Sequence, residues 1–520
     1  MTGIVQNEDI IIYRGCGDVP GYSTLRCQLK APAGTVVVLQ NNGKDDITVK
    51  TDSTGFCNFS FRNLPDSSQH NVTVKSAPAG MIFTIKGTPG YASSNSRIII
   101  KGEFGYDLIS RGNNDSIYGT FFESWDPGVI KELDDNGRYV VFVSQAQGLC
   151  GSTGKYRQVY WRDRLTNKTL MISRAPDGTE GNGNSFAPVI SVGSMYVAFE
   201  SYADNLVPGD LNAVRDVFLW RRTIEGGEVE RVSVGPAGAE ANGESFEPSV
   251  SGMGGHVAFS SSATNLTESP IEVSGVNVYL WQRNKTPILI SKDYKTGKGV
   301  GGSKPSIDMN GYKIAFCSYA HTLVPDDNNN LWDIFLYERN TNLADLPLRR
   351  ITMAYNGGER NQGDESSSRV VTPTISGDGK SIAYSTTASN LVPGDNNKVQ
   401  DVFIYDTETN NTVRVSVDSN GIEGNNSSPY GQGETIALSY DGRIAAFTTK
   451  ASNFDTPAGN VVMYNLDTKK MTPVTTITGG YVSAPSISRK GSYVVFGCSL
   501  PLDGRFTSSG LFSRYMGENQ

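Results

Sequence analysis

The stretch that decides the fold begins with Ser185-Phe-Ala-Pro-Val-Ile-Ser191 and Met195-Tyr-Val-Ala-Phe-Glu-Ser201. It continues through the turn Asn205-Leu-Val-Pro-Gly-Asp210 to Asp216-Val-Phe-Leu-Trp-Arg221 and Glu230-Arg-Val-Ser-Val234. Four short segments rich in β-branched and aromatic residues are separated by Gly, Pro, Asn and Asp, which is typical of antiparallel strands joined by turns. The same unit recurs along the chain, so we expect a repeat protein.

An aromatic residue on the second strand marks each copy of this unit, and a proline precedes it. The seven aromatic anchors are Phe142, Phe199, Phe259, Phe316, Tyr384, Phe447 and Phe496. Strands such as Tyr-Val-Ala-Phe and Val-Phe-Leu-Trp are apolar on both faces, as expected when each unit is covered on both sides by its neighbours. The sequence therefore predicts an all-β fold whose main part is a seven-bladed β-propeller.

The two ends of the repeat array complement each other. The seventh unit stops at Gln520 without a fourth strand, whereas Asp107-Leu-Ile-Ser-Arg111 lies ahead of the first unit and matches the fourth strand Leu170-Met-Ile-Ser-Arg174. We therefore expect this N-terminal segment to pair beside Leu511–Tyr515 and to close the last blade, which removes an exposed edge.

Residues 1–102 lack the repeat and predict a β-sandwich, with the propeller at 103–520. About seven short strands in some hundred residues are typical of a sandwich. Their similarity to bacterial immunoglobulin-like modules rests on Val-Lys-Thr-Asp-Ser-Thr-Gly-Phe-Cys-Asn-Phe. The expected strands are Ile10–Tyr13, Thr35–Leu39, Ile47–Lys50, Phe56–Phe61, Asn71–Val74, Met81–Ile85 and Arg97–Lys101.

Charge and hydropathy restrict the classes of function. The 520 residues carry a formal net charge of −7 without a conspicuous Lys/Arg cluster, which argues against nucleic acid as a partner. No apolar run approaches the length of a membrane span. The first residues lack the features of a signal peptide, so export by that route is not expected if Met1 is the natural start. A chain trimmed of its leader would look the same.

The cysteines and histidines do not form a metal motif. There are six cysteines and three histidines, no cysteine pair has Cys-x-x-Cys spacing, and His70, His256 and His321 are isolated. A disulfide among Cys16, Cys27 and Cys57 is one interpretation, and buried thiols are the simpler one.

The repeated motifs resemble the WD-like propeller repeats of TolB-like proteins. They include Pro-x-Ile-Ser, Asp378-Gly-Lys-Ser-Ile-Ala-Tyr384, Asn-Leu-Val-Pro-Gly-Asp and Asp401-Val-Phe-Ile-Tyr-Asp406, and the resemblance covers roughly residues 104–520. It implies a propeller fold and leaves the function open, because such rings serve protein binding, carbohydrate binding and scaffolding alike. TolB has six units and a different N-terminal module, so its role in the cell envelope is not implied.

The loop between the second and third strands repeats an acidic pattern in three units. Oxygen side chains at its positions 1, 3 and 7 would supply part of a calcium shell. The competing interpretation is that Asp and Asn merely cap tight turns. The candidate calcium ligands are Asp210, Asn212 and Asp216; Asp327, Asn329 and Asp333; and Asp395, Asn397 and Asp401.

A second loop motif, Gly-x-Glu-x-Asn, lies between successive units and places Glu180, Glu240, Glu359 and Glu423 at equivalent positions. These glutamates would form an acidic face for a cation or a basic partner, or they are solvated residues of simple turns. The turn interpretation is the simpler one.

No arrangement of a nucleophile beside a base is visible, so we expect a protein that is not an enzyme. The first hypothesis is a structural or adhesive component of an assembled particle such as a phage virion, with protein partners in that particle or in a cell envelope. The second is a secreted or periplasmic propeller that binds a protein or a surface glycan. The third is a glycosidase or lyase with paired carboxylates in the propeller channel.

Overall fold

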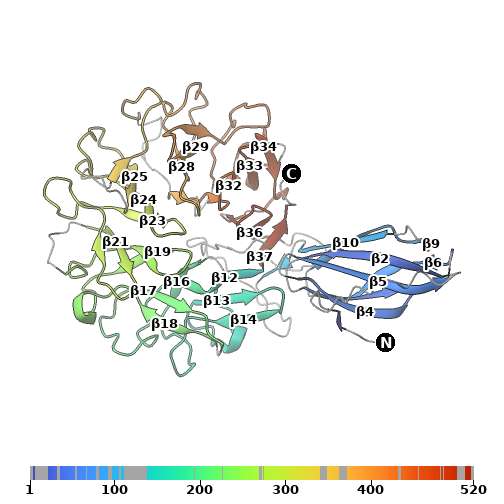
Figure 1. Ribbon diagram of the computed structural model, residues 1–520. Helices are drawn as coiled ribbons and strands as arrows, with labels where there is room; N and C mark the ends of the chain where they lie inside the picture. Colours follow the sequence, from blue (N-terminus) through green and yellow to red (C-terminus); the bar gives the residue numbers. More distant parts are fainter. Residues whose placement is uncertain are drawn as a thin grey trace. The chain divides into compact units, whose positions relative to one another are not determined.

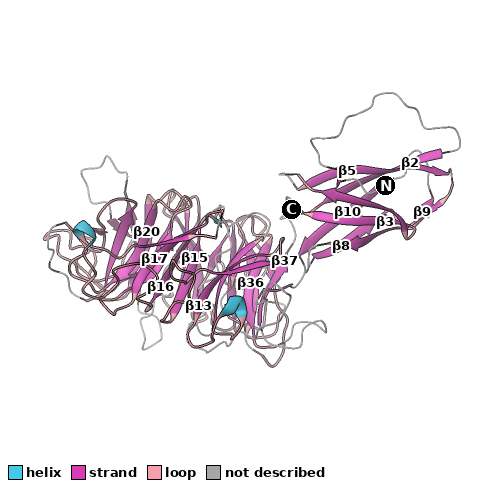
Figure 2. Cartoon of the chain, turned by 90° about the horizontal axis from the view of Figure 1, so that it is seen from below, coloured by secondary structure: helices cyan, strands magenta, loops and turns pink. Residues whose placement is uncertain are grey.

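The computed structural model describes the chain at residues 4–5, 22–31, 35–52, 55–65, 67–77, 81–91, 97–104, 107–109, 138–191, 194–224, 226–268, 272, 275–339, 348–361, 372–430, 435–454, 456–480, 482–483, 485–500 and 510–516. It is nearly all-β, and the helical segments in these ranges are short 3-10 turns such as Leu149–Gly151 and Pro236–Gly238 (Figure 2). Among the described residues no helix is long and apolar enough to cross a membrane.

The chain divides into two compact units. The first comprises Met1–Asp107 with Asp163–Lys168 and Ser513–Tyr515, and the second comprises the rest. The predicted boundary between residues 102 and 103 falls within β10 (Arg97–Phe104) and stays a prediction.

The first unit contains two four-stranded sheets whose apolar faces share one core, as a sandwich requires. One sheet has the order β1-β4-β3-β7, with β1 Ile4–Val5, β4 Lys44–Lys50, β3 Val36–Asn41 and β7 Val72–Ser76. The other has the order β5-β2-β10-β8, with β5 Phe56–Pro65, β2 Tyr22–Lys30 and β8 Met81–Lys86. A two-stranded sheet pairs β6 (Gln69–His70) with β9 (Gly90–Tyr91).

β2, which lies between β5 and β10 in the middle of its sheet, was not among the strands expected from the sequence. The signal was present, because Leu25, Cys27 and Leu29 alternate with polar residues and are buried. The strand expected at Ile10–Tyr13 lies outside the described residues, as does Cys16. Cys27 and Cys57 are free and buried, and burial raises the pKa of the Cys27 thiol to about 12.

In the second unit, successive antiparallel sheets are arranged around a common centre (Figure 1). The first three are β12-β13-β14 (Tyr139–Ser144, Gln158–Asp163, Lys168–Met171), β15-β16-β17-β18 (Ser185–Ile190, Tyr196–Ser201, Asp216–Arg221, Glu228–Arg231) and β19-β20-β21-β22 (Ser245–Val250, His256–Ser261, Asn277–Gln282, Ile288–Leu289).

The remaining sheets are β23-β24-β25-β26 (Ser303–Ile307, Lys313–Ser318, Asp333–Glu338, Leu348–Arg350), β27-β28-β29-β30 (Thr374–Ile375, Ser381–Thr386, Asp401–Asp406, Thr412–Arg414), β31-β32-β33-β34 (Ala437–Leu438, Ile444–Thr449, Asn460–Asn465, Lys470–Pro473) and β11-β37-β36-β35 (Asp107–Leu108, Gly510–Tyr515, Tyr493–Cys498, Ser486–Ile487).

The last sheet contains the closing strand that the sequence predicted. β11 lies beside β37, and the backbone N–H of Ile109 donates to the carbonyl of Leu511 at 2.7 Å. Ile109 and Leu511 share an apolar cluster with Val140 and Phe142 of the first sheet. The two ends of the array therefore pack against each other.

The repeated sequence motifs hold each sheet together. Five of the anchors stack on aromatic rings of the third strand, as Phe199 does on Phe218 with ring centroids 5.7 Å apart. The serine of Pro-x-Ile-Ser closes the first hairpin, since the Ser191 hydroxyl accepts the backbone N–H of Tyr196 at 3.0 Å. All seven anchors are buried, and adjacent sheets share the apolar cores.

Candidate functional site

Three of the repeats contain a buried cluster of charges centred on an arginine, which we call the arginine cluster. In the first, Arg231 Nη1 lies 2.8 Å from Asp210 Oδ1, 3.1 Å from Glu240 Oε1 and 3.5 Å from Asp216 Oδ2. The Arg231 and Asp210 side chains are 8% and 4% exposed, so the pair is shielded from water. One guanidinium thus faces two carboxylates of the acidic loop and a third from the loop that leads to the next unit.

The same geometry recurs in two further units. Arg350 faces Asp327 at 2.7 Å, Asp333 at 3.7 Å and Glu359 at 2.7 Å. The third cluster joins Arg414 to Asp395 at 2.9 Å, Asp401 at 3.5 Å and Glu423 at 2.9 Å.

The asparagine of each acidic loop points its donor, not its oxygen, at the cluster. Asn212 Nδ2 donates to Asp216 Oδ2 at 2.9 Å, while the Asn212 oxygen accepts the backbone N–H of Val214 at 3.2 Å. Asn329 and Asn397 repeat both bonds. Ser233 donates its hydroxyl to the other oxygen of Asp216.

These contacts bear on the two interpretations of the acidic loops. Calcium prefers six to eight oxygen ligands, whereas each set of aspartates here meets a guanidinium and an amide donor. Within the described ranges, no group of three or more His, Cys, Asp or Glu side chains is placed to hold a metal ion. The geometry favours loops that are structural turns, and calcium binding stays a prediction.

Burial controls the pKa of these carboxyl groups. Desolvation raises the pKa of Asp210 to about 6, against the attraction of Arg231 and with a contribution from the nearby Asp216 and Glu240 charges. The pKa of Asp395 is also raised to about 6, mainly by desolvation and secondly by the nearby charge of Asp401.

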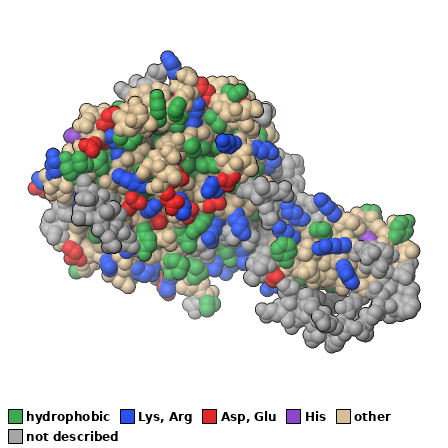
Figure 3. All heavy atoms as spheres, turned by 45° about the horizontal axis from the view of Figure 1, so that its top comes forward, with side chains coloured by type: hydrophobic (Ala, Val, Ile, Leu, Met, Phe, Trp, Pro, Cys, Tyr) green, Lys and Arg blue, Asp and Glu red, His purple; other side chains and the backbone are tan. Residues whose placement is uncertain are grey.

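Three glutamates of Gly-x-Glu-x-Asn, Glu240, Glu359 and Glu423, belong to the arginine clusters. The fourth, Glu180, accepts the backbone N–H of Thr153 at 2.8 Å. Glu240 accepts the backbone N–H of Leu211 at 2.6 Å in addition to its contact with Arg231. The motif asparagine joins the next unit: the backbone N–H of Asn242 donates to Asn265 Oδ1, and Asn265 Nδ2 donates to the carbonyl of Glu240. On the face seen in Figure 3, acidic and basic side chains are interspersed.

The arginines at the centres of these clusters were not among the residues expected from the sequence. Each is followed two residues later by a hydroxyl side chain, in Arg231-Val-Ser233, Arg350-Ile-Thr352 and Arg414-Val-Ser416. The recurrence of Arg-x-Ser/Thr on the fourth strand, always downstream of an Asp-x-Asn loop, was the signal that could have found them.

A cavity of about 620 Å³ occupies the centre of the ring and is lined by first strands of the sheets. Two acidic and three basic residues line it, namely Glu200, Glu247, Arg215, Lys304 and Arg489. Arg215 lies 3.0 Å from Glu200 Oε1, and the backbone N–H of Glu247 donates to Glu200 Oε2 at 2.7 Å. Ser260 donates to Glu247 Oε2 at 2.8 Å.

A strand irregularity brings the side chains of Glu247 and Lys304 to the cavity. Ala187, Glu247 and Lys304 each precede a proline and have φ of 44°, 54° and 56°. The pairing register shifts at the same point in all three strands, as in a β-bulge, and this re-aims the side chain.

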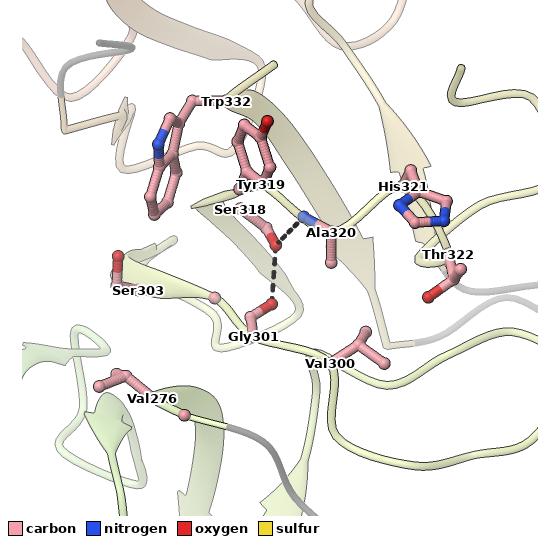
Figure 4. A pocket seen from close by; sticks show the side chains of 12 residues that line it. Val276, Val300, Gly301, Ser303, Ser318, Tyr319, Ala320, His321, Thr322 and Trp332 are labelled. Carbon is pink, nitrogen blue, oxygen red and sulfur yellow. Dashed lines mark hydrogen bonds between the residues drawn. The ribbon is translucent and has the colours of Figure 1, made fainter. Parts of the chain in front are cut away.

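A second hollow, of about 570 Å³, lies where the third and fourth units meet (Figure 4). Its most exposed large side chains are Tyr319 and Trp332, at 51% and 37%. Their ring centroids are 6.1 Å apart and the ring planes are tilted by 57°. We call this hollow the aromatic pocket.

Comparisons with known proteins find similar solved structures but no family. No family model matches the chain, and no curated protein matches its sequence. Among solved structures, an oligogalacturonate lyase from Vibrio parahaemolyticus is similar with a TM-score of 0.48 and 12% identity over 84% of this chain and 97% of that one. A puromycin hydrolase is similar with a TM-score of 0.44 and 12% identity over 76% of this chain and 55% of that one. TolB from Acinetobacter baumannii is similar with a TM-score of 0.33 and 14% identity over 75% of this chain and 79% of that one.

These comparisons correct one expectation. We expected a protein that is not an enzyme, and this expectation is wrong, because the solved structures similar to this chain include a lyase and a hydrolase. The missing nucleophile–base motif was too narrow a test, since paired carboxylates in a channel come from separate repeats and have no local signature.

Proposed function

We propose that this chain is a binding protein built on a seven-bladed β-propeller, preceded by an immunoglobulin-like β-sandwich, and that it belongs to an assembled particle such as a phage virion. The aromatic pocket is the observation that supports the binding role. It stands out because the other repeated positions, such as the arginine clusters, are buried and stabilise the ring. Sites of recognition are expected where a repeat departs from its own pattern, because the regular positions maintain the fold.

The combination of a sandwich with a propeller supports a role in such a particle, since these modules are typical of proteins that work outside the cytoplasm. Its partners would be other proteins of the particle or of a cell envelope, and surface glycans. The alternative is a secreted or periplasmic propeller with the same binding role.

Fractionation of the producing cells tests this proposal. We expect the protein, detected by mass spectrometry, to co-sediment with particles through a density gradient and to stay attached after a salt wash. Recovery in the periplasmic extract would support the alternative. Recovery only as free protein in the cytosol would contradict both.

The central cavity favours a second candidate, a glycosidase or lyase. Glu200 and Glu247 approach it together beside Arg215, and paired carboxylates perform general acid–base chemistry on glycosidic bonds. The test is the release of reducing ends or unsaturated products from polysaccharides. We expect Glu247→Gln to abolish a true activity, whereas a product that persists in this variant would exclude the site.

A further inference from the structure

We infer that the aromatic pocket binds a neutral sugar ring, as part of a free oligosaccharide or of a surface glycan. This inference rests on the proposed binding role and names the ligand class. The pocket is assembled from the start of β21, the start of β23, the segment after β24 and the residue before β25.

The pocket exists because the fourth unit replaces a charged group with an aromatic one. In the second unit, Arg215 precedes Asp216, pairs with Glu200 and lies over the Tyr202 ring at 5.6 Å. The corresponding residues of the fourth unit are Trp332 before Asp333, Cys317 after the anchor Phe316, and Tyr319. The ion pair is gone and an indole stands beside the tyrosine.

Small residues leave the space open. In the second unit, Phe186 stands two residues before Pro188 and its ring lies against that of Tyr202, with centroids 6.5 Å apart, whereas Ser303 holds the equivalent position before Pro305 in the fourth unit. Gly301 and Gly302 precede it, and a Cβ built on Gly301 would meet only the Val276 carbonyl, at 3.9 Å. Figure 4 shows Gly301 and Val300 across the hollow from the paired rings.

The lining fits a neutral ligand with an apolar face and polar edges. None of the twelve described residues that line the pocket is Asp, Glu, Lys or Arg. A pyranose places C–H groups on its faces, which pack on electron-rich rings, and hydroxyls at its edge. The phenol of Tyr319, the indole N–H of Trp332 and His321 can exchange hydrogen bonds with such hydroxyls.

The tilt of the rings distinguishes a sugar from a flat aromatic ligand. A nucleobase prefers a parallel slot, which two planes inclined by 57° do not form. A puckered ring can place one face on Trp332 and an edge against Tyr319. The volume of about 570 Å³ accommodates a disaccharide.

Calorimetric titration of the full chain with cellobiose, lactose and diacetylchitobiose, each to about 10 mM, tests the inference. We expect at least one to bind, and Trp332→Ala and Tyr319→Ala each to weaken it by about tenfold or more. The matched control is Tyr202→Ala, at the equivalent position of the second unit, which should leave the affinity unchanged.

Further ligands distinguish a surface glycan from free sugars and from a nucleoside. Binding of an isolated bacterial surface polysaccharide that is lost after periodate oxidation would identify a glycan as the source, and binding of the disaccharides alone would identify free sugars. Adenosine binding in place of sugars, or unchanged affinity in Trp332→Ala, would overturn the inference. Failure with all sugars while the protein still co-sediments with particles would reject the inference and keep the proposed function.

Discussion

At the scale of single residues, each arginine cluster contains more acidic than basic side chains. Arg231 offers one positive charge to Asp210, Asp216 and Glu240 in a largely buried site. A buried ion pair contributes little net stability compared with an apolar group, but removal of one partner is costly because the other charge stays buried. Each cluster should therefore be sensitive to loss of its arginine.

We predict that Arg231→Met lowers the free energy of unfolding by about 3–5 kcal/mol, because two buried aspartates lose their counter-charge. Chemical denaturation measures this change. The control is Arg221→Met, whose partner Glu228 is exposed, and whose loss should cost about 0–1 kcal/mol. Equal effects of the two substitutions would show that burial of the cluster is not what matters.

The raised pKa of Asp210 predicts a pH dependence. Its folded-state pKa is about 6, against an ordinary value of 3.8, so the folded state binds more protons between these values. Its contribution to stability is therefore complete below about pH 4 and is lost as the pH rises through about 6. Melting curves of wild type and Asp210→Asn should diverge across this window, and parallel curves would contradict the pKa shift.

At the scale of elements, the loops between second and third strands are tied down by side chains of the fourth strand and of the next unit. Asn212 also donates to the carbonyl of Ala241, so the loop is held from within the protein. We expect such a loop to keep its shape without a bound ion.

We accordingly predict that EDTA leaves the melting temperature within about 1 °C of its value in millimolar calcium, since a ligand that does not bind the folded state cannot stabilise it. Differential scanning fluorimetry measures this. A calcium-dependent rise that Asp327→Asn abolishes would establish the calcium site instead.

At the scale of the whole molecule, the ring depends on a strand that precedes the repeats in sequence. β11 pairs with β37, and Ile109 is fully buried in the cluster where the last and first sheets meet. Without this strand, β37 would present an unpaired edge and the cluster would open to water.

We predict that a chain lacking residues 1–104 keeps a cooperative melt, whereas one lacking residues 1–109 aggregates or melts at a much lower temperature. Light scattering and thermal melts of the two truncations measure the difference, and indistinguishable behaviour would refute ring closure by β11. As a milder check, Ile109→Ala in the full chain should cost about 2–5 kcal/mol of unfolding free energy.

The sequence alone determined the strands, the repeat and the closing strand, because alternation of apolar residues and turn chemistry are local and recur at fixed offsets. Even β2, which was missed, carries this local signal. Tertiary structure alone decided what Asp210 and Glu240 face, since Arg231 reaches them from a different segment. It also decided where the aromatic pocket opens, because Tyr319, Trp332 and Gly301 come from separate loops, and only packing determines whether the space between them is filled.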